Sequence, residues 1–320
     1  MTEQARALED FLQREIGRIV YGVEDVVHAL TIALLGRGHV LLEGPPGLGK
    51  TLLANSFARA LGGVFKRVQG TADLMPTDLT GLHVFNPEAR RFEFREGPLF
   101  ADVVLVDEIN RAGPKTQSAL LEAMEERFVT VDGERFRLPE DFLVVATQNP
   151  REFEGTYPLP ESQLDRFMLG VRMDYPAREQ EARILAEYAL PSAAQSLPLE
   201  VEPVDRGLVA GARSGLEAVH VSDALTDYIL DLVAATRQSS SISLGLSSRA
   251  ALALARAARI EAALRGGSFV VPDDVKRVAA WVVPHRIELA PDAVLDGHSA
   301  HAELERILDA VAVPRDPRSA

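Results

Sequence analysis

A glycine-rich loop between an apolar run and a helical stretch constrains this chain more than any other feature. The run His39–Leu42 leads into Gly44-Pro45-Pro46-Gly47-Leu48-Gly49-Lys50-Thr51, and the helical stretch Thr51–Leu61 follows. This order matches the G-x-x-x-x-G-K-S/T pattern in the strand–loop–helix context that the pattern requires. Glycines let backbone N–H groups turn inward around phosphates, and the following helix presents its positive N-terminus to them. The sequence therefore predicts a nucleotide phosphate site at the edge of a parallel sheet.

The last residues of this loop have predicted roles toward ATP and Mg²⁺. The ammonium group of Lys50 neutralises the β- and γ-phosphates, and the hydroxyl of Thr51 is a Mg²⁺ ligand. The alternative is a chance glycine-rich turn before a helix. The residues predicted to bind the nucleotide here are Gly44, Pro45, Pro46, Gly47, Leu48, Gly49, Lys50, Thr51 and Leu52.

Two adjacent carboxylates follow a second apolar run. The run Val103–Val106 ends in Asp107 and Glu108. Ligands bind at the carboxyl edge of parallel strands, so both side chains are expected beside the phosphates. We expect Asp107 to hold Mg²⁺ through water, and Glu108 to orient or deprotonate the attacking water. This pair favours hydrolysis over transfer to another acceptor; the alternative is that both carboxylates cap the next helix.

Short apolar runs alternate with helical patterns over the first part of the chain. Most of the runs lack polar alternation, as in strands that are buried on both faces of a parallel sheet. This rhythm predicts a three-layer α/β domain. The expected strands are His39–Leu42, Val64–Val68, Val103–Val106, Leu143–Ala146 and Phe167–Val171.

Three further elements are predicted within this domain. Hairpins are expected at His83–Phe94 and at Phe128–Arg137, and the second turns at Asp132-Gly133, a strong two-residue hairpin signal. The N-terminal segment predicts an amphipathic helix whose apolar side carries Leu8, Phe11, Leu12 and Ile16.

The composition changes after this domain. Residues 190–204 contain three prolines and little periodicity, which predicts a linker. Helical patterns follow at Ser222–Thr236, Ser248–Leu264 and Asp273–Val283, with Ser222 and Asp273 as predicted N-caps. We therefore expect a nucleotide-binding domain at residues 1–190, a linker at 191–204 and a small all-α domain at 205–320.

The bulk composition bounds the location and the partners. The formal net charge is −13, and an acidic surface repels phosphate backbones, so nucleic acid is not an expected partner. The chain has no cysteine, which excludes disulfides and cysteine-ligated zinc. The N-terminal segment lacks the apolar core of a signal peptide, and no apolar stretch is long enough to span a membrane. The expected location is cytoplasmic.

Long runs of this sequence resemble the MoxR family of AAA+ ATPases. The run from Asp107 to Glu126 carries the resemblance, and Ala146–Pro150, Gly155–Glu161 and Gln163–Phe167 extend it. The similarity covers nearly the whole chain, from about Ile19 to about Glu288. It implies an AAA+ domain with a helical lid, assembly into a homo-oligomeric ring, expected to be a hexamer, and action on a protein partner that carries a von Willebrand factor A domain.

The resemblance also implies roles for single residues. Asn149 matches the polar sensor of the γ-phosphate, Arg166 the arginine finger that enters a neighbouring subunit's site, and Arg249 the sensor arginine of the lid. Tyr21 and Gly22 lie in the segment that lines the adenine pocket in this family. The two predicted hairpins are similar to the helix-2 insert and the pre-sensor hairpin.

Each of the three polar residues has a simpler alternative. Asn149 could cap a turn, and Arg166 could form an ion pair with Glu161 or Asp165. Arg249 could cap its own helix, because the family more often has a proline where this chain has Ser248.

Several functions remain open from the sequence. The first is an ATPase that remodels or matures a partner protein. The second is a nucleotide-gated scaffold with little turnover. A magnesium-chelatase-type motor subunit is the third, and a nucleic-acid motor, which the acidic charge disfavours, is the fourth.

Overall fold

The computed structural model describes residues 2–149, 155–189 and 201–314, which form two compact units. One unit contains residues 10–159 and 171–206, and the other contains residues 1–9, 160–170 and 207–320. The linker predicted at residues 191–204 lies mostly outside the described residues. The boundaries predicted at residues 190 and 205 therefore stay a prediction.

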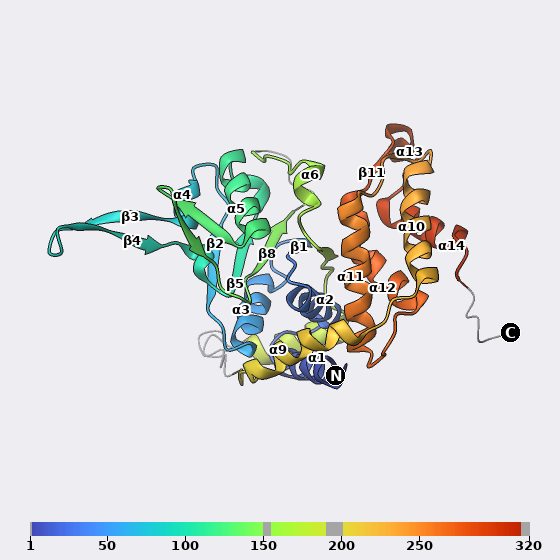
Figure 1. The fold of residues 1–320 in the computed structure, drawn as a ribbon, viewed down its shortest axis with the longest axis horizontal. Coiled ribbons are helices and arrows are strands. Elements are labelled where there is room, and N and C mark those ends of the chain that lie inside the picture. The colour runs from blue at the N-terminus through green and yellow to red at the C-terminus, as the bar shows by residue number, and fades with distance from the viewer. Residues whose placement is uncertain (1, 150–154, 190–200, 315–320) are drawn as a thin grey trace. The chain divides into compact units, whose positions relative to one another are not determined.

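A five-stranded parallel sheet in the order β2-β5-β8-β1-β9 is the centre of the first unit (Figure 1). Alternating apolar runs had predicted all five strands, and the observed bounds differ by only a few residues. Both central strands β5 and β8 are almost entirely buried, as expected for strands covered on both faces. The bounds are β1 Val40–Glu43, β2 Phe65–Gln69, β5 Val103–Asp107, β8 Leu143–Gln148 and β9 Leu169–Arg172.

Helices cover the sheet and complete the three predicted layers. Helix α3 packs against β2 and β5, and α2 packs against β1. Helix α2 was not predicted from sequence, because ten successive residues from Val26 to Leu35 are buried and an apolar stripe is absent. The bounds are α2 Glu24–Leu35, α3 Lys50–Ala60, α4 Pro76–Thr80, α5 Pro114–Glu126 and α7 Arg178–Tyr188, with 3₁₀ turns η1 Pro98–Phe100 and η2 Ile109–Arg111.

Helix α1, Thr2–Gly17, has the predicted amphipathic character. Leu8, Leu12 and Ile16, which are four residues apart, are fully buried. Phe11 is only half-buried, and the guanidinium of Arg14 lies over its ring at 5.3 Å from the centroid. Three of the four predicted residues therefore form the buried stripe.

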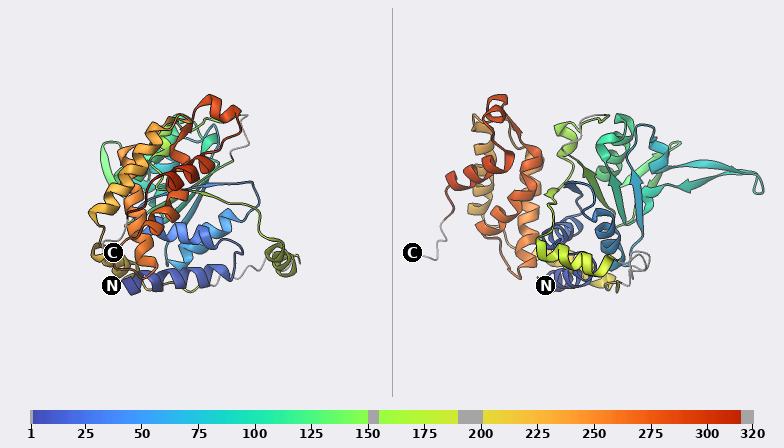
Figure 2. Two further views of the ribbon diagram at one scale, coloured as in Figure 1. Left: turned by 90° about the vertical axis from the view of Figure 1, so that its right-hand side faces the viewer. Right: turned by 180° about the vertical axis from the view of Figure 1, so that it is seen from behind.

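Both predicted hairpins are present. The first joins β3 Gly81–Asn86 to β4 Arg91–Glu96, and it stands away from the parallel sheet (Figures 1 and 2). The second joins β6 Phe128–Val131 to β7 Glu134–Arg137 through Asp132 (φ 51°) and Gly133 (φ 86°). Positive φ at both central residues is the geometry that the Asp-Gly pair predicts.

The two hairpins contact one another. The rings of Phe94 and Phe136 are stacked with centroids 4.0 Å apart, and His83 Nδ1 lies 2.8 Å from Asp132 Oδ2. An aromatic stack and a polar contact therefore join the two hairpins.

The second unit is mainly helical. Helix α11 packs against α10 and α12, and α14 packs against α10 and α12. A short antiparallel pair joins β10 Ile242–Leu244 to β11 Glu288–Leu289. The remaining bounds are α6 Glu161–Leu164, α9 Arg206–Gly215, α10 Asp223–Gln238, α11 Ser248–Leu264, α12 Pro272–Val282, η4 Pro284–Arg286, α13 Pro291–Leu295 and α14 Ala300–Ala310.

One of the two predicted N-caps is confirmed. The Ser222 side chain accepts a hydrogen bond from the Leu225 N–H group at the start of α10. The Asp273 prediction is wrong, because α12 already begins at Pro272 and its N-cap is Val271. Asp274, at the third helical position, accepts the Val271 N–H at 2.8 Å instead.

None of the helices within residues 2–149, 155–189 and 201–314 is both long and apolar enough to cross a membrane.

Candidate functional site

The glycine-rich loop connects β1 to α3 in a conformation that requires glycine. Gly44, Gly47 and Gly49 have φ of 155°, 84° and 77°. A Cβ on Gly44 would lie 2.4 Å from the carbonyl oxygen of Met173, which is backbone and cannot swing aside. Gly49 is also the N-cap of α3 and has no side chain that could block the N–H groups of the first helical turn. The loop thus keeps its backbone accessible to an anion.

Lys50 folds back over this loop. Its Nζ donates a hydrogen bond to the carbonyl oxygen of Gly44 at 2.6 Å. Burial lowers the pKa of Lys50, while the nearby carboxylates of Asp107, Glu108 and Glu43 raise it and so favour the charged ammonium form. The positive charge is therefore held where the loop would present it to phosphate oxygens.

Thr147 holds Asp107 and Glu108 in fixed positions. Its buried hydroxyl accepts the Glu108 N–H at 2.9 Å and donates to Asp107 Oδ1 at 3.2 Å. Glu108 has φ 54° and ψ 52°, a left-handed conformation that disfavours residues with a Cβ. Strand β8 therefore fixes the carboxyl end of β5 in a strained geometry of the kind found at functional sites.

Two side chains of β2 contact the same carboxylates. The Arg67 guanidinium lies 2.6 Å from Asp107 Oδ2, and Gln69 Nε2 donates to Glu108 Oε2 at 2.9 Å. The parallel register places Gln69 opposite Asp107, and Arg67 projects from the same face two residues earlier. No local sequence pattern gives Arg67, Gln69 or Thr147 a role, because only the register between strands brings them to the acid pair.

These groups line a cavity of about 360 Å³. It brings together most of the predicted phosphate-binding and metal-binding residues, and Asn149, which directly follows β8, lies in its wall. Pro45 is the one residue of the predicted loop set that does not line it. The predicted residues in the wall are Gly44, Pro46, Gly47, Leu48, Gly49, Lys50, Thr51, Leu52, Asp107, Glu108 and Asn149.

An adjoining, more apolar cavity of about 480 Å³ shares Gly47, Leu48, Gly49 and Leu52 with the first. Helix α7 and the residues before it form its other wall, which sequence analysis missed. Of the two predicted adenine-pocket residues, Tyr21 lines the cavity and Gly22 does not. The remaining wall residues are Ile19, Val20, Tyr175, Pro176, Glu181, Ile184, Leu185 and Tyr188.

Tyr21 is fixed by residues of α7. Its hydroxyl donates to Glu187 Oε2 at 2.6 Å, and the Arg183 guanidinium lies 4.3 Å from the ring centroid. The hydrogen bond to Glu187 is the main cause of a raised pKa of Tyr21, with burial as the second. The ring therefore stays neutral and forms a rigid, mostly apolar wall.

Arg166 and Arg249 belong to the other compact unit. Arg166 follows α6, and its N–H group donates to the carbonyl oxygen of Gln163. Arg249 is exposed and is the second residue of α11, whose N-cap is Ser247. Ser247 Oγ accepts the Ala250 N–H at 3.0 Å, so the helix begins without the proline common in the family. The catalytic roles of both arginines stay predictions.

Two family models match separate parts of the chain. Residues 39–169 match the family model of ATPases associated with various cellular activities, and residues 234–307 match an AAA lid domain. The chain is similar to the Mycobacterium tuberculosis protein named chaperone MoxR1, with 41% identity over 94% of this chain and 81% of the relative.

Two further relatives cover almost the whole chain. The Bacillus subtilis protein YeaC is 45% identical over 93% of this chain and 92% of the relative. A crystal structure of a Cytophaga hutchinsonii protein aligns with a TM-score of 0.89 and 37% identity, covering 98% of both chains. These similarities extend through both compact units, and with them the chain belongs to the MoxR family of AAA+ ATPases.

Proposed function

We propose that the chain hydrolyses Mg-ATP and uses the hydrolysis cycle to remodel or mature a partner protein. The observation that carries this proposal is the Thr147 hydroxyl, which bonds to Asp107 and Glu108 in the cavity that also contains Lys50. Membership of an AAA family implies nucleotide binding, and this geometry supports hydrolysis as the reaction.

The residues of the cavity fit a triphosphate with its metal. Gly44, Gly47 and Gly49 adopt positive φ and carry no side chain that could cover the backbone N–H groups, and Lys50 supplies the positive charge. Thr51 and Asp107 would hold Mg²⁺, which proteins commonly bind through one or two such groups plus substrate phosphates. When bound, the metal neutralises charge on the β- and γ-phosphates. Arg67 would then have to share or release its contact with Asp107.

Glu108 is the proposed base for water. Its carboxylate is about one-third exposed, and Gln69 Nε2 and Arg111 Nε lie 2.9 and 3.3 Å from Glu108 Oε2. The second oxygen, Oε1, is therefore the one we assign to the attacking water. Asn149, in the same wall, is the proposed γ-phosphate sensor.

The remaining machinery is proposed to come from assembly. In a head-to-tail ring, which we propose to be hexameric, Arg166 of one subunit would complete the site of the next. Arg249 would sense the bound nucleotide and report its state to the lid. The adjoining apolar cavity is proposed to take the adenine base against Tyr21.

The partner is proposed to be a protein with a von Willebrand factor A domain, on the family resemblance alone. The relative's name, chaperone MoxR1, supports a remodelling outcome. A nucleotide-gated scaffold with little turnover and a chelatase-type motor subunit are the competing functions, and the ordered Glu108 favours turnover over the scaffold.

Steady-state phosphate release, measured against protein concentration, tests the proposal. The specific activity should rise with concentration, and both Arg166→Ala and Glu108→Gln should abolish turnover while leaving ATP bound. An arginine finger contributes roughly 10³–10⁵ in rate, so the Arg166→Ala effect should be large. Activity that is independent of concentration and unaffected by Arg166→Ala would rule out a shared site. Undetectable turnover of the wild-type protein at every concentration would favour the scaffold.

A further inference from the structure

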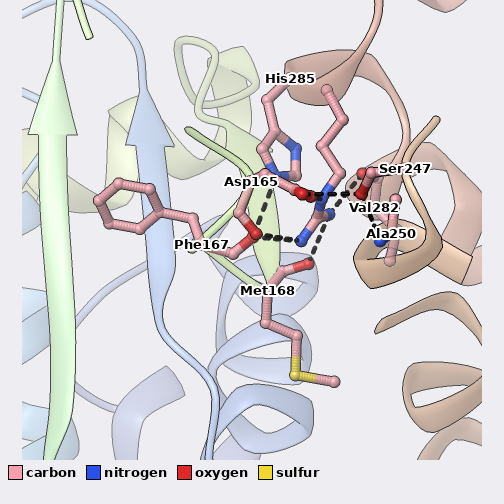
Figure 3. A network of polar contacts seen from close by, with 8 residues as sticks. Asp165, Phe167, Met168, Ser247, Ala250, Val282 and His285 are labelled. Carbon is pink, nitrogen blue, oxygen red and sulfur yellow. Dashed lines mark hydrogen bonds and ion pairs between the residues drawn. The ribbon is translucent and has the colours of Figure 1, made fainter. Parts of the chain in front are cut away.

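Arg286 is a buried arginine that all of the functions above leave unexplained. Its side chain is 2% exposed and forms an ion pair with Asp165, with 2.8 Å between Arg286 Nε and Asp165 Oδ1 (Figure 3). Burying a charged side chain this completely is unfavourable unless the group is paired and hydrogen-bonded. The surroundings of Arg286 therefore show what the charge holds in place.

Each N–H group of this guanidinium has an acceptor. Nη1 donates to the carbonyl oxygens of Met168 at 3.0 Å and Val282 at 2.6 Å. Nη2 donates to the carbonyl oxygens of Phe167 at 2.5 Å and Asp165 at 3.4 Å. Together with the Nε bond to the Asp165 carboxylate, these contacts use all five donors of an arginine side chain.

Four of the five acceptors lie on both sides of Arg166 in the chain, and the fifth is the Val282 carbonyl oxygen of α12. Asp165 precedes Arg166, and Phe167 and Met168 follow it, so the backbone is fixed before and after this residue (Figure 3). His285 strengthens the same contact, because its Nε2 lies 3.2 Å from the Phe167 carbonyl oxygen. Burial lowers the pKa of His285 well below its ordinary value, so the ring is neutral and adds no second positive charge.

Asp165 connects the same segment to the start of α11. Its Oδ2 accepts the hydroxyl hydrogen of Ser247 at 2.7 Å, while Oδ1 is bound to Arg286. Ser247 is the N-cap of the helix on which Arg249 lies. One carboxylate thus joins Arg286 to the beginning of the helix that carries the proposed sensor arginine.

Residues 160–170 form one compact unit with residues 207–320, although the ATPase family model extends through residue 169. We propose that Arg286 and Asp165 are positioning residues that fix Arg166 to the helical lid, so that the finger offered to a neighbouring subunit moves with the lid. This inference rests on the proposed shared site. It adds the route by which a lid movement in one subunit would change hydrolysis in the next.

The geometry predicts how sensitive the rate should be. A displacement of about 1 Å in a catalytic group can lower a rate roughly 10²-fold. Lysine retains the charge of Arg286 but cannot reproduce a planar fork with five donors, so Arg286→Lys should misplace Arg166 without removing it. Ser247→Asp keeps a good N-cap while placing a second carboxylate against Asp165.

A mixing experiment separates positioning from a general loss of structure. Glu108→Gln subunits cannot hydrolyse ATP but retain Arg166, and Arg166→Ala subunits retain the hydrolytic site but lack the finger. In a ring of randomly mixed subunits, about one quarter of the head-to-tail interfaces join an intact site to an intact finger. The mixture should therefore regain activity that neither variant has alone.

Arg286→Lys is then placed in one kind of subunit at a time. In the Glu108→Gln subunit, which donates the finger, it should lower kcat of the mixture roughly 10- to 100-fold with KM unchanged. In the Arg166→Ala subunit it should change kcat far less. Arg265→Lys is the matched control, because Arg265 pairs with buried Asp274 in the same unit and leaves residues 165–168 untouched.

The outcomes distinguish this inference from the function on which it rests. No activity in the unmodified mixture would overturn the shared site and this proposal together. Restored activity that Arg286→Lys leaves unchanged, or lowers equally from either subunit, would overturn the positioning role alone. Arg286→Lys should lower the melting temperature more than Arg265→Lys, because Arg286 is 2% exposed and Arg265 is about half-exposed. Binding of a fluorescent ATP analogue, measured on Arg286→Lys and Ser247→Asp, should still stay close to that of Arg265→Lys. A large loss of binding would assign the network to folding instead.

Discussion

Replacing Thr147 by valine removes a hydroxyl that holds both acid residues while keeping the shape of the side chain. Thr147 is 3% exposed, and its hydroxyl bonds to the Glu108 N–H and to Asp107 Oδ1. A bond to a charged acceptor contributes about 1.5–3 kcal/mol and a neutral one about 0.5–1.5 kcal/mol. Asp107 keeps its contact with Arg67, so we expect the lower part of the summed range, a loss of about 2–3 kcal/mol in the free energy of unfolding.

The same change should slow hydrolysis more than it weakens binding. The left-handed conformation of Glu108 is strained by about 1–2 kcal/mol, and the Thr147 hydroxyl helps to hold it. Without that bond the backbone should relax and turn the carboxylate away from the proposed water, which lowers kcat at least about tenfold. KM for ATP should change little, because the loop and Lys50 are untouched.

Urea unfolding and steady-state phosphate release measure the two effects. Thr147→Ser is the matched control, because it keeps the hydroxyl and removes one methyl group, which is worth about 0.8 kcal/mol. Thr147→Val with a stability within about 0.5 kcal/mol of the wild type and an unchanged kcat would refute the reasoning.

Three further predictions follow from other residues. Burial lowers the pKa of His39 to about 3, and Nδ1 accepts the Val144 N–H, so the folded ring is neutral. The unfolded ring binds a proton below about pH 6.5, so the contribution of neutral His39 to stability is complete above that pH and falls by about 2 kcal/mol on acidification to about pH 5. In urea titrations, the free energy of unfolding of His39→Gln should therefore depend less on pH than that of the wild type. An equal pH dependence of the two proteins would contradict this. Gln69→Ala should lower kcat several-fold with little change in KM, because it removes one of the two contacts that hold Glu108 Oε2; an unchanged phosphate-release rate would mean that the contact is incidental. Gly44→Ala should abolish nucleotide binding in a titration with a fluorescent analogue, whereas Gly133→Ala, with φ of 86° but open space around it, should retain binding.

Local patterns were sufficient for much of the fold and for part of the site. The phosphate loop, the acid pair at the end of β5 and the Asp132-Gly133 turn each depend on neighbours within a few residues, and the structure contains the corresponding strand, helix and hairpin. Helix α2 was missed because nearly all of its residues are buried, so its sequence lacks amphipathic periodicity. Asp273 was the wrong cap because Pro272 already fits the first helical position.

The rest of the site depends on contacts between distant parts of the chain. Arg67 and Gln69 reach the acid pair only through the register of β2 against β5. Helix α7 lines the apolar cavity together with residues that lie far from it in the sequence. One example is the hydrogen bond from the Tyr188 hydroxyl to the carbonyl oxygen of Ile19. Arg286 binds mainly backbone carbonyls, and a carbonyl carries no sequence signal. Such partners could be predicted only after the fold is known.

The long separation between Arg286 and its acceptors sets an order of events during synthesis. Asp165 and Arg286 are 121 residues apart in the chain. At a ribosomal rate of about 5–20 residues per second, Asp165 leaves the peptidyl-transferase centre roughly 6–24 seconds before Arg286 is made. During that interval residues 165–168 lack the guanidinium that later holds them, so the segment carrying Arg166 reaches its final form only once most of the chain has been translated. A fragment that ends before Arg286 would retain the whole phosphate loop but leave the proposed finger without its anchor.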